Sequence, residues 1–283
     1  MKRRLTVLLP VDPYLLDHHF EGKAVLPAVE SLILLARIVR KHNPGAGLGH
    51  QTDALFPRLL VIDQEAEVMD LQVQLEESPA GIKASLWSSM KIRNSAMSRR
   101  LEHASVTFAH DDSFTQKVKP FHEAVAPADG CINIPCAVIY RELISFGPSY
   151  QNITGDLAVY ADGALACIAG GAGNVDDTIL GSPFVLDAAM HAACVWGQRF
   201  VGIVPFPTGI GRRIIHKITK KDKTYLARVA PARVDAGELF FDVWIFEPDG
   251  VLCETITGLH MRDITQGRMS PPGWVGEGTW RRS

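Results

Sequence analysis

The sequence is short of cysteine and of excess charge of either sign, and each shortage excludes a class of protein. Five scattered cysteines in 283 residues, an odd number, do not form a disulfide framework and fit a reducing cytosol. The formal net charge is −2 and no long basic run is present, so we expect no nucleic-acid partner.

Long apolar runs are also missing. No segment reaches the roughly 18 uninterrupted apolar residues of a membrane-spanning helix. Near the N-terminus the apolar run ends at Pro10, before it is long enough for a signal peptide. We therefore expect a soluble, cytoplasmic protein with no membrane span.

Cofactor motifs are scarce in the same way. Cys131 and Cys136 lack the second pair of ligands that a zinc site needs. The Gly-Gly-Ala-Gly run at 170–173 matches neither the dinucleotide fingerprint nor the phosphate-binding loop. The sequence thus predicts no metal and no bound cofactor.

What the sequence does contain is a histidine in front of a strongly apolar helix. His18, Gly22 and Pro27 are spaced His-x3-Gly-x4-Pro, and an apolar segment follows directly. Proline suits the first turn of a helix, which predicts a buried helix over residues 27–42. A titratable imidazole held at the mouth of such a helix is a candidate general base.

The same plan occurs twice along the chain. A second apolar helix is predicted over 183–200, again opening with a proline. Each helix is followed by strand-like runs, and another pair of strands is predicted within 152–170. A polar, Pro- and Gly-rich linker is expected over 111–136, and an irregular tail over 265–283. The runs predicted to be strands after the two helices lie at 56–62, 68–77, 81–90, 101–110, 216–220, 225–234, 239–246 and 251–262.

Aligning Pro27 with Pro183 superposes the two helices and shows how the halves differ. The second half has no histidine at the place of His18, and the first has Ser31 where the second has Asp187. Two halves packed with pseudo-two-fold symmetry would bring His18 and Asp187 to one shared site. An imidazole suits the removal of a proton near neutral pH, and a buried carboxyl group whose pKa is raised can deliver one.

Each of these residues also has a purely structural interpretation. Asp187 lies near a helix start and could act as a capping or first-turn acid. His191 is four residues further on the same helical face, where it could orient Asp187 or simply bond a backbone carbonyl in the core. Gly22 could bring a backbone N–H close to a substrate carbonyl, or could only serve a turn.

Four motifs in this order resemble the dehydratase domains of polyketide synthases. The first is His18-x3-Gly22-x4-Pro27, which is similar to their HxxxGxxxxP motif. The other three are Phe-Gly-Pro-Ser-Tyr at 146–150, similar to the end of GYxYGPxF, Asp187-x3-His191, similar to Dxxx(Q/H), and Val-Pro-Phe at 204–206. The closing hairpin around Pro-Asp-Gly at 248–250 is similar as well, so the resemblance covers about residues 5–264.

The resemblance implies an α+β double hot-dog fold, in which two antiparallel sheets each wrap a long buried helix. The halves would span 1–125 and 126–283. It also implies a hydro-lyase that removes water from (3R)-3-hydroxyacyl thioesters to give trans-2-enoyl thioesters. The substrate would be carried on the phosphopantetheine arm of an acyl carrier protein, the expected partner, beside other synthase components. A homodimer is also plausible for a hot-dog protein.

Roles for individual residues follow from the same resemblance. His18 would be the base and Asp187 the acid, with His191 and Gly22 in support. Positions that would line the substrate site are Pro27, Gly147, Pro148, Tyr150, Pro205 and Phe206.

The sequence also departs from the family pattern. Ile144 and Phe146 stand where both tyrosines of GYxYGPxF would be, so any contact those tyrosines make to substrate is lost. The sequence contains no ketosynthase, reductase or carrier segment, so we expect either a free-standing dehydratase that acts in trans or a fragment of a larger synthase. Two alternatives are an aldol cyclase of poly-β-keto chains, similar to product-template domains, and a non-catalytic acyl-binding or scaffold module.

Overall fold

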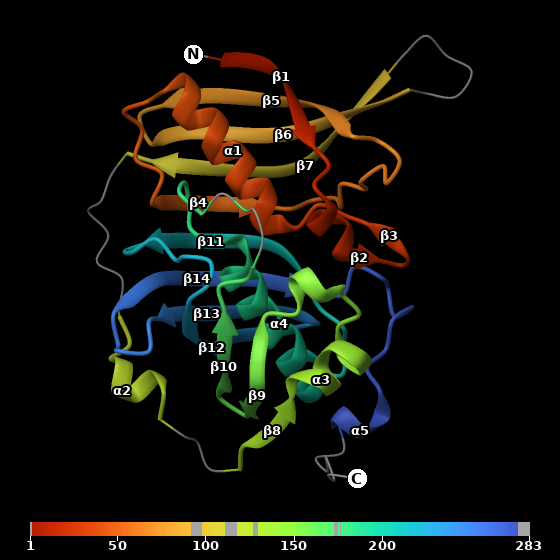
Figure 1. Cartoon of the computed structure of the whole chain (residues 1–283), viewed down its shortest axis with the longest axis vertical. Coiled ribbons are helices and arrows are strands. Elements are labelled where there is room, and N and C mark those ends of the chain that lie inside the picture. The colour runs from red at the N-terminus through yellow and green to blue at the C-terminus, as the bar shows by residue number, and fades with distance from the viewer. Residues whose placement is uncertain are drawn as a thin grey trace.

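The computed structural model describes residues 2–91, 98–110, 118–126, 130–172, 175 and 177–276. Within them, twelve strands form one antiparallel sheet, and a separate two-stranded hairpin carries the loop after His18 (Figure 1). In spatial order the strands are β1 (Lys2–Pro10), β5 (Val68–Ser78), β6 (Gly81–Lys91), β7 (Ser98–Ala109), β4 (His50–Leu55), β11 (Phe206–Ile215), β14 (Leu252–Arg262), β13 (Glu238–Phe246), β12 (Thr224–Asp235), β10 (Gly163–Ala169), β9 (Ile153–Tyr160) and β8 (Ile132–Pro135).

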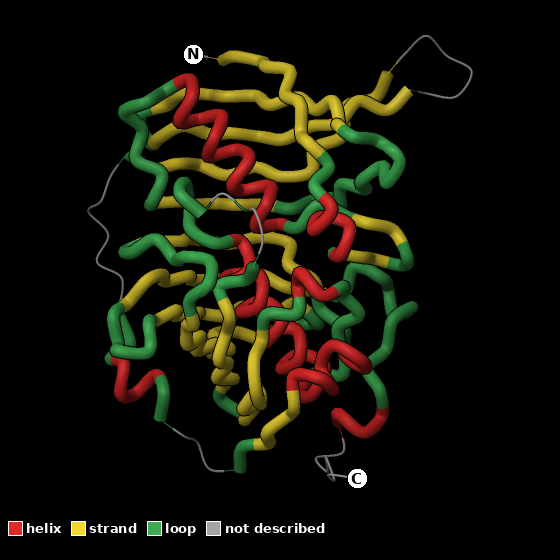
Figure 2. Tube along the Cα trace, in the orientation of Figure 1, coloured by secondary structure: helices red, strands yellow, loops and turns green. Residues whose placement is uncertain are grey.

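Two long helices lie against this sheet, one in each half (Figures 1 and 2). The first, α1 (Ala28–His42), packs on β5, β6 and β7, and Pro27 immediately precedes it. The second, α4 (Pro183–Phe200), packs on β9, β10, β12 and β13. Both predicted helices are therefore present within one residue of their expected bounds.

The remaining elements are short. They connect the strands or cover the cavity described below. They are η1 (Pro13–Asp17), the hairpin β2 (His19–Phe20) and β3 (Lys23–Ala24), α2 (Phe121–Ala124), α3 (Cys136–Val138), η2 (Ile139–Leu143), η3 (Pro148–Tyr150) and α5 (Gly273–Gly276).

Local sequence explains these elements. In β5 the alternating residues Leu71, Val73 and Leu75 are buried, as period-2 patterning predicts for a sheet with one wet face. At the start of α4 the Ser182 hydroxyl accepts a hydrogen bond from the backbone N–H of Phe184, and Pro183 occupies the first turn. Ser182, and not Asp187, is thus the residue that caps this helix.

The two halves are joined edge to edge. Strand β4 of the first half pairs with β11 of the second, from Leu55 opposite Gly209 to His50 opposite Ile214. A Cβ at Gly209 would lie 2.8 Å from the Ala54 carbonyl oxygen, so the close approach of the backbones requires glycine there. The double hot-dog architecture therefore has one continuous sheet in place of the two separate sheets expected.

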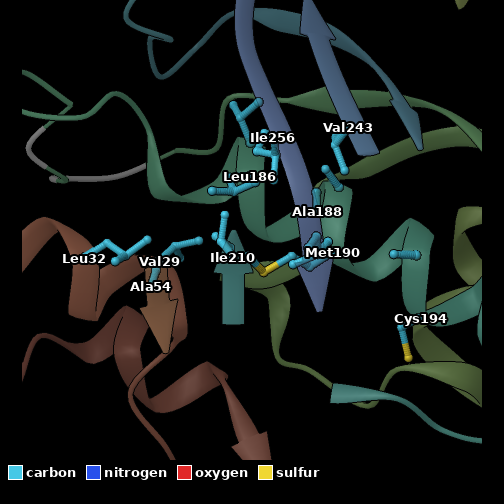
Figure 3. Close-up of a cluster of buried hydrophobic side chains, with 14 of the residues drawn as sticks. Val29, Leu32, Ala54, Leu186, Ala188, Met190, Cys194, Ile210, Val243 and Ile256 are labelled. Atoms are coloured by element: carbon cyan, nitrogen blue, oxygen red, sulfur yellow. The ribbon is translucent and has the colours of Figure 1, made fainter. Parts of the chain in front are cut away.

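The core is also continuous across this junction. Figure 3 shows Val29, Leu32 and Ala54 of the first half beside Ile210, Leu186 and Met190 of the second. All of them belong to one cluster of buried apolar side chains. The halves consequently fold around a shared interior, and the predicted division at 125/126 falls in the connection between β7 and β8.

Three predictions about local structure need correction, namely two of the predicted strands and the predicted linker. No strand covers 56–62, because Pro57 has no N–H and interrupts the run. The backbone there makes isolated hydrogen bonds instead: the Phe56 N–H donates to the Thr208 carbonyl oxygen on β11, and the Leu60 carbonyl oxygen accepts from the Leu26 N–H. Residues 216–220 are also not a strand. Thr219 instead accepts a hydrogen bond from the Ser182 N–H at the start of α4.

The expected linker over 111–136 is not wholly a linker, because β8 within it completes the sheet edge. Residues 111–117 and 127–129 of that segment, Gly173 of the glycine run, and 277–283 of the expected tail lie outside the described residues.

A buried ion pair fixes the junction strand to the entry of α4. The Arg213 Nε on β11 lies 2.8 Å from the Glu254 Oε2 on β14, with both side chains at most 4% exposed. Arg213 also donates to the Leu180 carbonyl oxygen, just before the helix cap. Its charge is therefore balanced and bonded on both sides.

Replacing Glu254 with Gln should destabilise the fold by about 3–5 kcal/mol, because the buried Arg213 charge loses its counter-charge. Urea unfolding measures this. The matched control is Glu76→Gln, which removes an exposed pair with Lys2 and should cost less than about 1 kcal/mol. Equal small losses in both variants would contradict the assigned role.

Candidate active site

A cavity of about 380 Å³ lies where the two halves meet. His18 reaches it from the loop after η1, and Asp187 reaches it from the second turn of α4. Five residues of α4 line it at helical spacing, namely Asp187, Met190, His191, Cys194 and Gln198. At 1.5 Å per residue this face extends the cavity for about 16 Å along the helix.

The His18 ring is held in one orientation by the strand that follows it. Nδ1 lies 3.1 Å from the Val25 carbonyl oxygen, and the Val25 N–H donates to the His18 carbonyl oxygen. A carbonyl oxygen can only accept, so the ring hydrogen sits on Nδ1 and Nε2 keeps its lone pair. Burial lowers the pKa of His18 to about 4, an effect that the nearby Asp187 charge partly opposes. His18 is thus a neutral imidazole at pH 7.

Asp187 and His191 form a close pair one helical turn apart. Asp187 Oδ2 lies 2.9 Å from His191 Nε2, and both side chains are nearly inaccessible to solvent. The two atoms are not aligned for a hydrogen bond, and among the described residues neither has another hydrogen-bond partner. The pair is therefore a tight polar contact that still has bonding capacity toward the cavity.

Phe146 separates the two histidines. Its ring centroid lies 4.2 Å from that of His18 and 5.1 Å from that of His191. This is one of the two positions where the family motif has tyrosine. Ile144, at the other, also lines the cavity. The wall between the histidines is apolar as a result.

Apart from Phe146, which lines the cavity, the Phe-Gly-Pro-Ser-Tyr turn positions the His18 loop. The Gly147 N–H donates to the Asp17 carbonyl oxygen at 2.7 Å, and the Ser149 N–H donates to Asp17 Oδ2 at 2.9 Å. Tyr150 is fully buried with its ring edge-on to His18 at 5.2 Å. Of the turn residues predicted to bind substrate, Gly147, Pro148 and Tyr150 lie outside the cavity wall and behind His18.

Of the other predicted site residues, some line the cavity and one lies outside its wall. Pro205 and Phe206 line the cavity, whereas Pro27 caps α1 behind it. Gly22 lines the cavity at the tip of the β2–β3 hairpin, where Glu21 and Gly22 have φ of 47° and 76°. Two positive φ values are the signature of a type I′ turn, which accounts for the glycine.

Several residues of the site have no signal in the sequence. Tyr140, on η2, is buried, and its hydroxyl lies 3.3 Å from His191 Nδ1. His103, on β7, lines the cavity, and its Nε2 is 2.7 Å from the Ser88 hydroxyl. Met269, in the segment read as an irregular tail, also lines the cavity, and its neighbour Arg268 pairs with Glu21 at 2.6 Å. Only long-range contacts of the folded chain reveal these residues.

The described residues contain no group of three or more His, Cys, Asp or Glu side chains that could hold a metal ion. Likewise, none of the helices in the described ranges is long and apolar enough to cross a membrane. The imidazole of His18 and the carboxyl group of Asp187, which both line the cavity, are suited to proton transfer.

The lowered pKa of His18 can be tested directly. In ¹⁵N-labelled protein, the His18 ring should remain neutral at about pH 5.5, with its hydrogen on Nδ1, whereas an ordinary histidine is largely protonated there. The unfolded chain takes up this proton near pH 6.5, so between that value and about 4 the wild type should lose stability relative to His18→Gln as the pH falls. Titration of the His18 signal, assigned by its loss in His18→Gln, near pH 6.5 would contradict the burial argument.

The tie between the turn and the His18 loop can be tested at Gly147. A Cβ there would lie 2.3 Å from Asp17 Oδ1, so Gly147→Ala should push Asp17 away and destabilise the protein by about 1–3 kcal/mol in urea unfolding. The control is Gly45→Ala, because a Cβ at Gly45 meets nothing within 4 Å. If both variants unfold at the same urea concentration as the wild type, the packing argument is wrong.

Comparison with known proteins agrees with this architecture. Residues 138–271 match the family model described as the polyketide synthase dehydratase N-terminal domain. No curated protein matches the sequence.

Solved structures similar to this chain include three dehydratases of polyketide assembly lines. The N-terminal dehydratase from the difficidin assembly line superposes with a TM-score of 0.72 at 16% identity, covering 95% of each chain. The dehydratase domain from the CurJ module of curacin polyketide synthase gives 0.70 at 19%, covering 92% of each chain. The bifunctional dehydratase-cyclase domain in ambruticin biosynthesis gives 0.68 at 16%, covering 92% of this chain and 90% of that chain.

At these identities the structural likeness establishes the fold alone. Residues 138–271 match the dehydratase family model, and over nearly its whole length the chain has the double hot-dog fold of the dehydratase domains it resembles.

Proposed function

We propose that this protein removes water from (3R)-3-hydroxyacyl thioesters and releases trans-2-enoyl thioesters, with the acyl chain delivered by an acyl carrier protein. One observation carries the proposal. A neutral histidine from the first half and a buried carboxyl group from the second line the same cavity. These are the two groups that a β-elimination of water needs, a base for the proton at C2 and an acid for the hydroxyl at C3.

His18 is suited to the first task. Its Nδ1 is fixed on the Val25 carbonyl, so the lone pair on Nε2 is available to take the proton from C2 of the substrate. The electron pair of the broken C–H bond becomes the C2–C3 double bond. Because the pKa of the free ring is about 4, His18 is in its basic form throughout the neutral range.

Asp187 completes the elimination. As the C3–O bond breaks, the departing hydroxyl takes a proton from the Asp187 carboxyl group and leaves as water. The negative charge left on Asp187 attracts the proton that His18 has taken up. Transfer of the C2 proton from His18 back to Asp187, directly or through solvent, restores the starting state.

The shape of the cavity supports a chain-like substrate. The lined face of α4 continues from Asp187 past Met190 and Cys194 to Gln198, which gives an acyl chain about 16 Å of wall beyond the acid. Pro205, Phe206 and Met261 add apolar surface. The thioester and the carrier arm would lie toward the Gly22 hairpin.

The comparisons keep one other catalytic reading open. The ambruticin relative is described as a bifunctional dehydratase-cyclase, so product analysis has to separate elimination from ring closure. A poly-β-keto chain that cyclises while a hydroxyacyl chain persists would identify a cyclase. Binding without conversion of either would identify an acyl-binding module.

Conversion of carrier-bound 3-hydroxyacyl chains should appear in mass spectrometry as a loss of about 18 daltons, the mass of water. His18→Ala should abolish this loss, and Asp187→Asn should slow it by about 10²–10⁴-fold, the usual contribution of a positioned acid or base.

The adjacent His19 provides the matched control. It also lines the cavity, but it belongs to the β2–β3 hairpin, and the proposed mechanism gives it no proton to transfer. His19→Ala should therefore retain far more activity than His18→Ala. Full turnover by His18→Ala, or equal losses in both histidine variants, would refute the assignment of the base.

A further inference from the structure

Tyr140 is a buried tyrosine whose hydroxyl contacts His191, the neighbour of Asp187. It lies on η2, a single π-helical turn, and does not line the cavity. Its oxygen accepts a hydrogen bond from the Ile153 N–H at 2.8 Å, and the Asn152 backbone amide acts on the same oxygen. With its lone pairs engaged by backbone donors, the hydroxyl has its own hydrogen left to give.

The nearest acceptor for that hydrogen is His191. The distance from the Tyr140 hydroxyl to His191 Nδ1 is 3.3 Å, and the two rings meet edge to face. A nitrogen that accepts a hydrogen bond carries a lone pair, so a neutral His191 must carry its hydrogen on Nε2. That is the atom 2.9 Å from Asp187 Oδ2.

We infer that Tyr140 is a positioning residue that sets the tautomer of His191, so that an N–H and not a lone pair faces Asp187. This inference rests on the proposed function, in which Asp187 delivers a proton. An N–H beside the carboxyl group stabilises the carboxylate that forms when the proton leaves, whereas a lone pair there would repel it. Tyr140 would thus stabilise the Asp187 carboxylate through His191, without touching the substrate.

Tyr140 brings a hydroxyl to a site whose motif lacks two tyrosines of the family pattern. Phe146 and Ile144 offer no hydroxyl, and the Phe146 ring packs against His191. The hydroxyl in contact with His191 comes instead from η2, outside the four motifs.

The inference predicts two changes in Tyr140→Phe that a structural defect alone would not produce. In ¹⁵N-labelled protein without substrate, His191 should change from the Nε2–H form to a form with appreciable Nδ1–H. In kinetics, kcat should fall about tenfold, as expected for one hydrogen bond, with KM unchanged.

Tyr160→Phe is the matched control. Tyr160 is equally buried, on β9, and among the described residues its hydroxyl has no hydrogen-bond partner. Its loss should leave the His191 tautomer and kcat unchanged. Wild-type His191 in the Nδ1–H or doubly protonated form, or an unaltered tautomer in Tyr140→Phe, would overturn the inference. The His191 tautomer is measured without substrate, so a failure of this inference is distinguishable from a failure of the dehydratase assignment.

Discussion

The pairing of β4 with β11 is the constraint on which the rest of the structure depends. It turns two half-sheets into one and sets the register of the first half against the second. His18 precedes the helix of one half, and Asp187 lies on the helix of the other. Because backbone hydrogen bonds fix the seam, the relative placement of the two residues does not rely on side-chain packing alone. The shared core and the buried Arg213–Glu254 pair reinforce the same junction.

The electrostatics of the site follow from how it is enclosed. His18 is surrounded closely enough that its charged form is disfavoured, and the apolar ring of Phe146 keeps it apart from His191. Asp187 is equally enclosed and has a histidine beside it. In an enclosed site of this kind, opposite charges on neighbouring groups attract each other strongly.

Much of this arrangement could be predicted from the sequence, because its signals are local. Proline before an apolar run predicted both long helices, and alternation predicted β5 and most of the later strands. The two seam strands were not predicted. Residues 50–55 are short and polar, and residues 206–215 contain Pro207, Gly209 and Gly211, which read as breakers. Their strand state is imposed by pairing with each other, a contact between residues more than 150 positions apart.

The candidate site likewise contains residues that the sequence could identify and residues that it could not. His18 and Asp187 could be singled out because their motifs are contiguous in the sequence. Tyr140, His103 and Met269 could not, because nothing near them in sequence marks their approach to the cavity. The Gly-Pro turn was read as a wall of the substrate site, but its glycine and serine amides bind Asp17 instead. The sequence could identify this motif, but it could not predict its contact with Asp17.

The contact between Gly147 and Asp17 also bears on how this sequence can diverge. The φ of Gly147 is −69°, which any residue can adopt, so the backbone itself does not demand glycine. The demand comes from a carboxylate 130 positions earlier, which fills the space that a side chain would need. The two positions are therefore coupled in evolution. A lineage that enlarges residue 147 has to shrink residue 17 as well, and loses with it the anchor of the loop that presents His18.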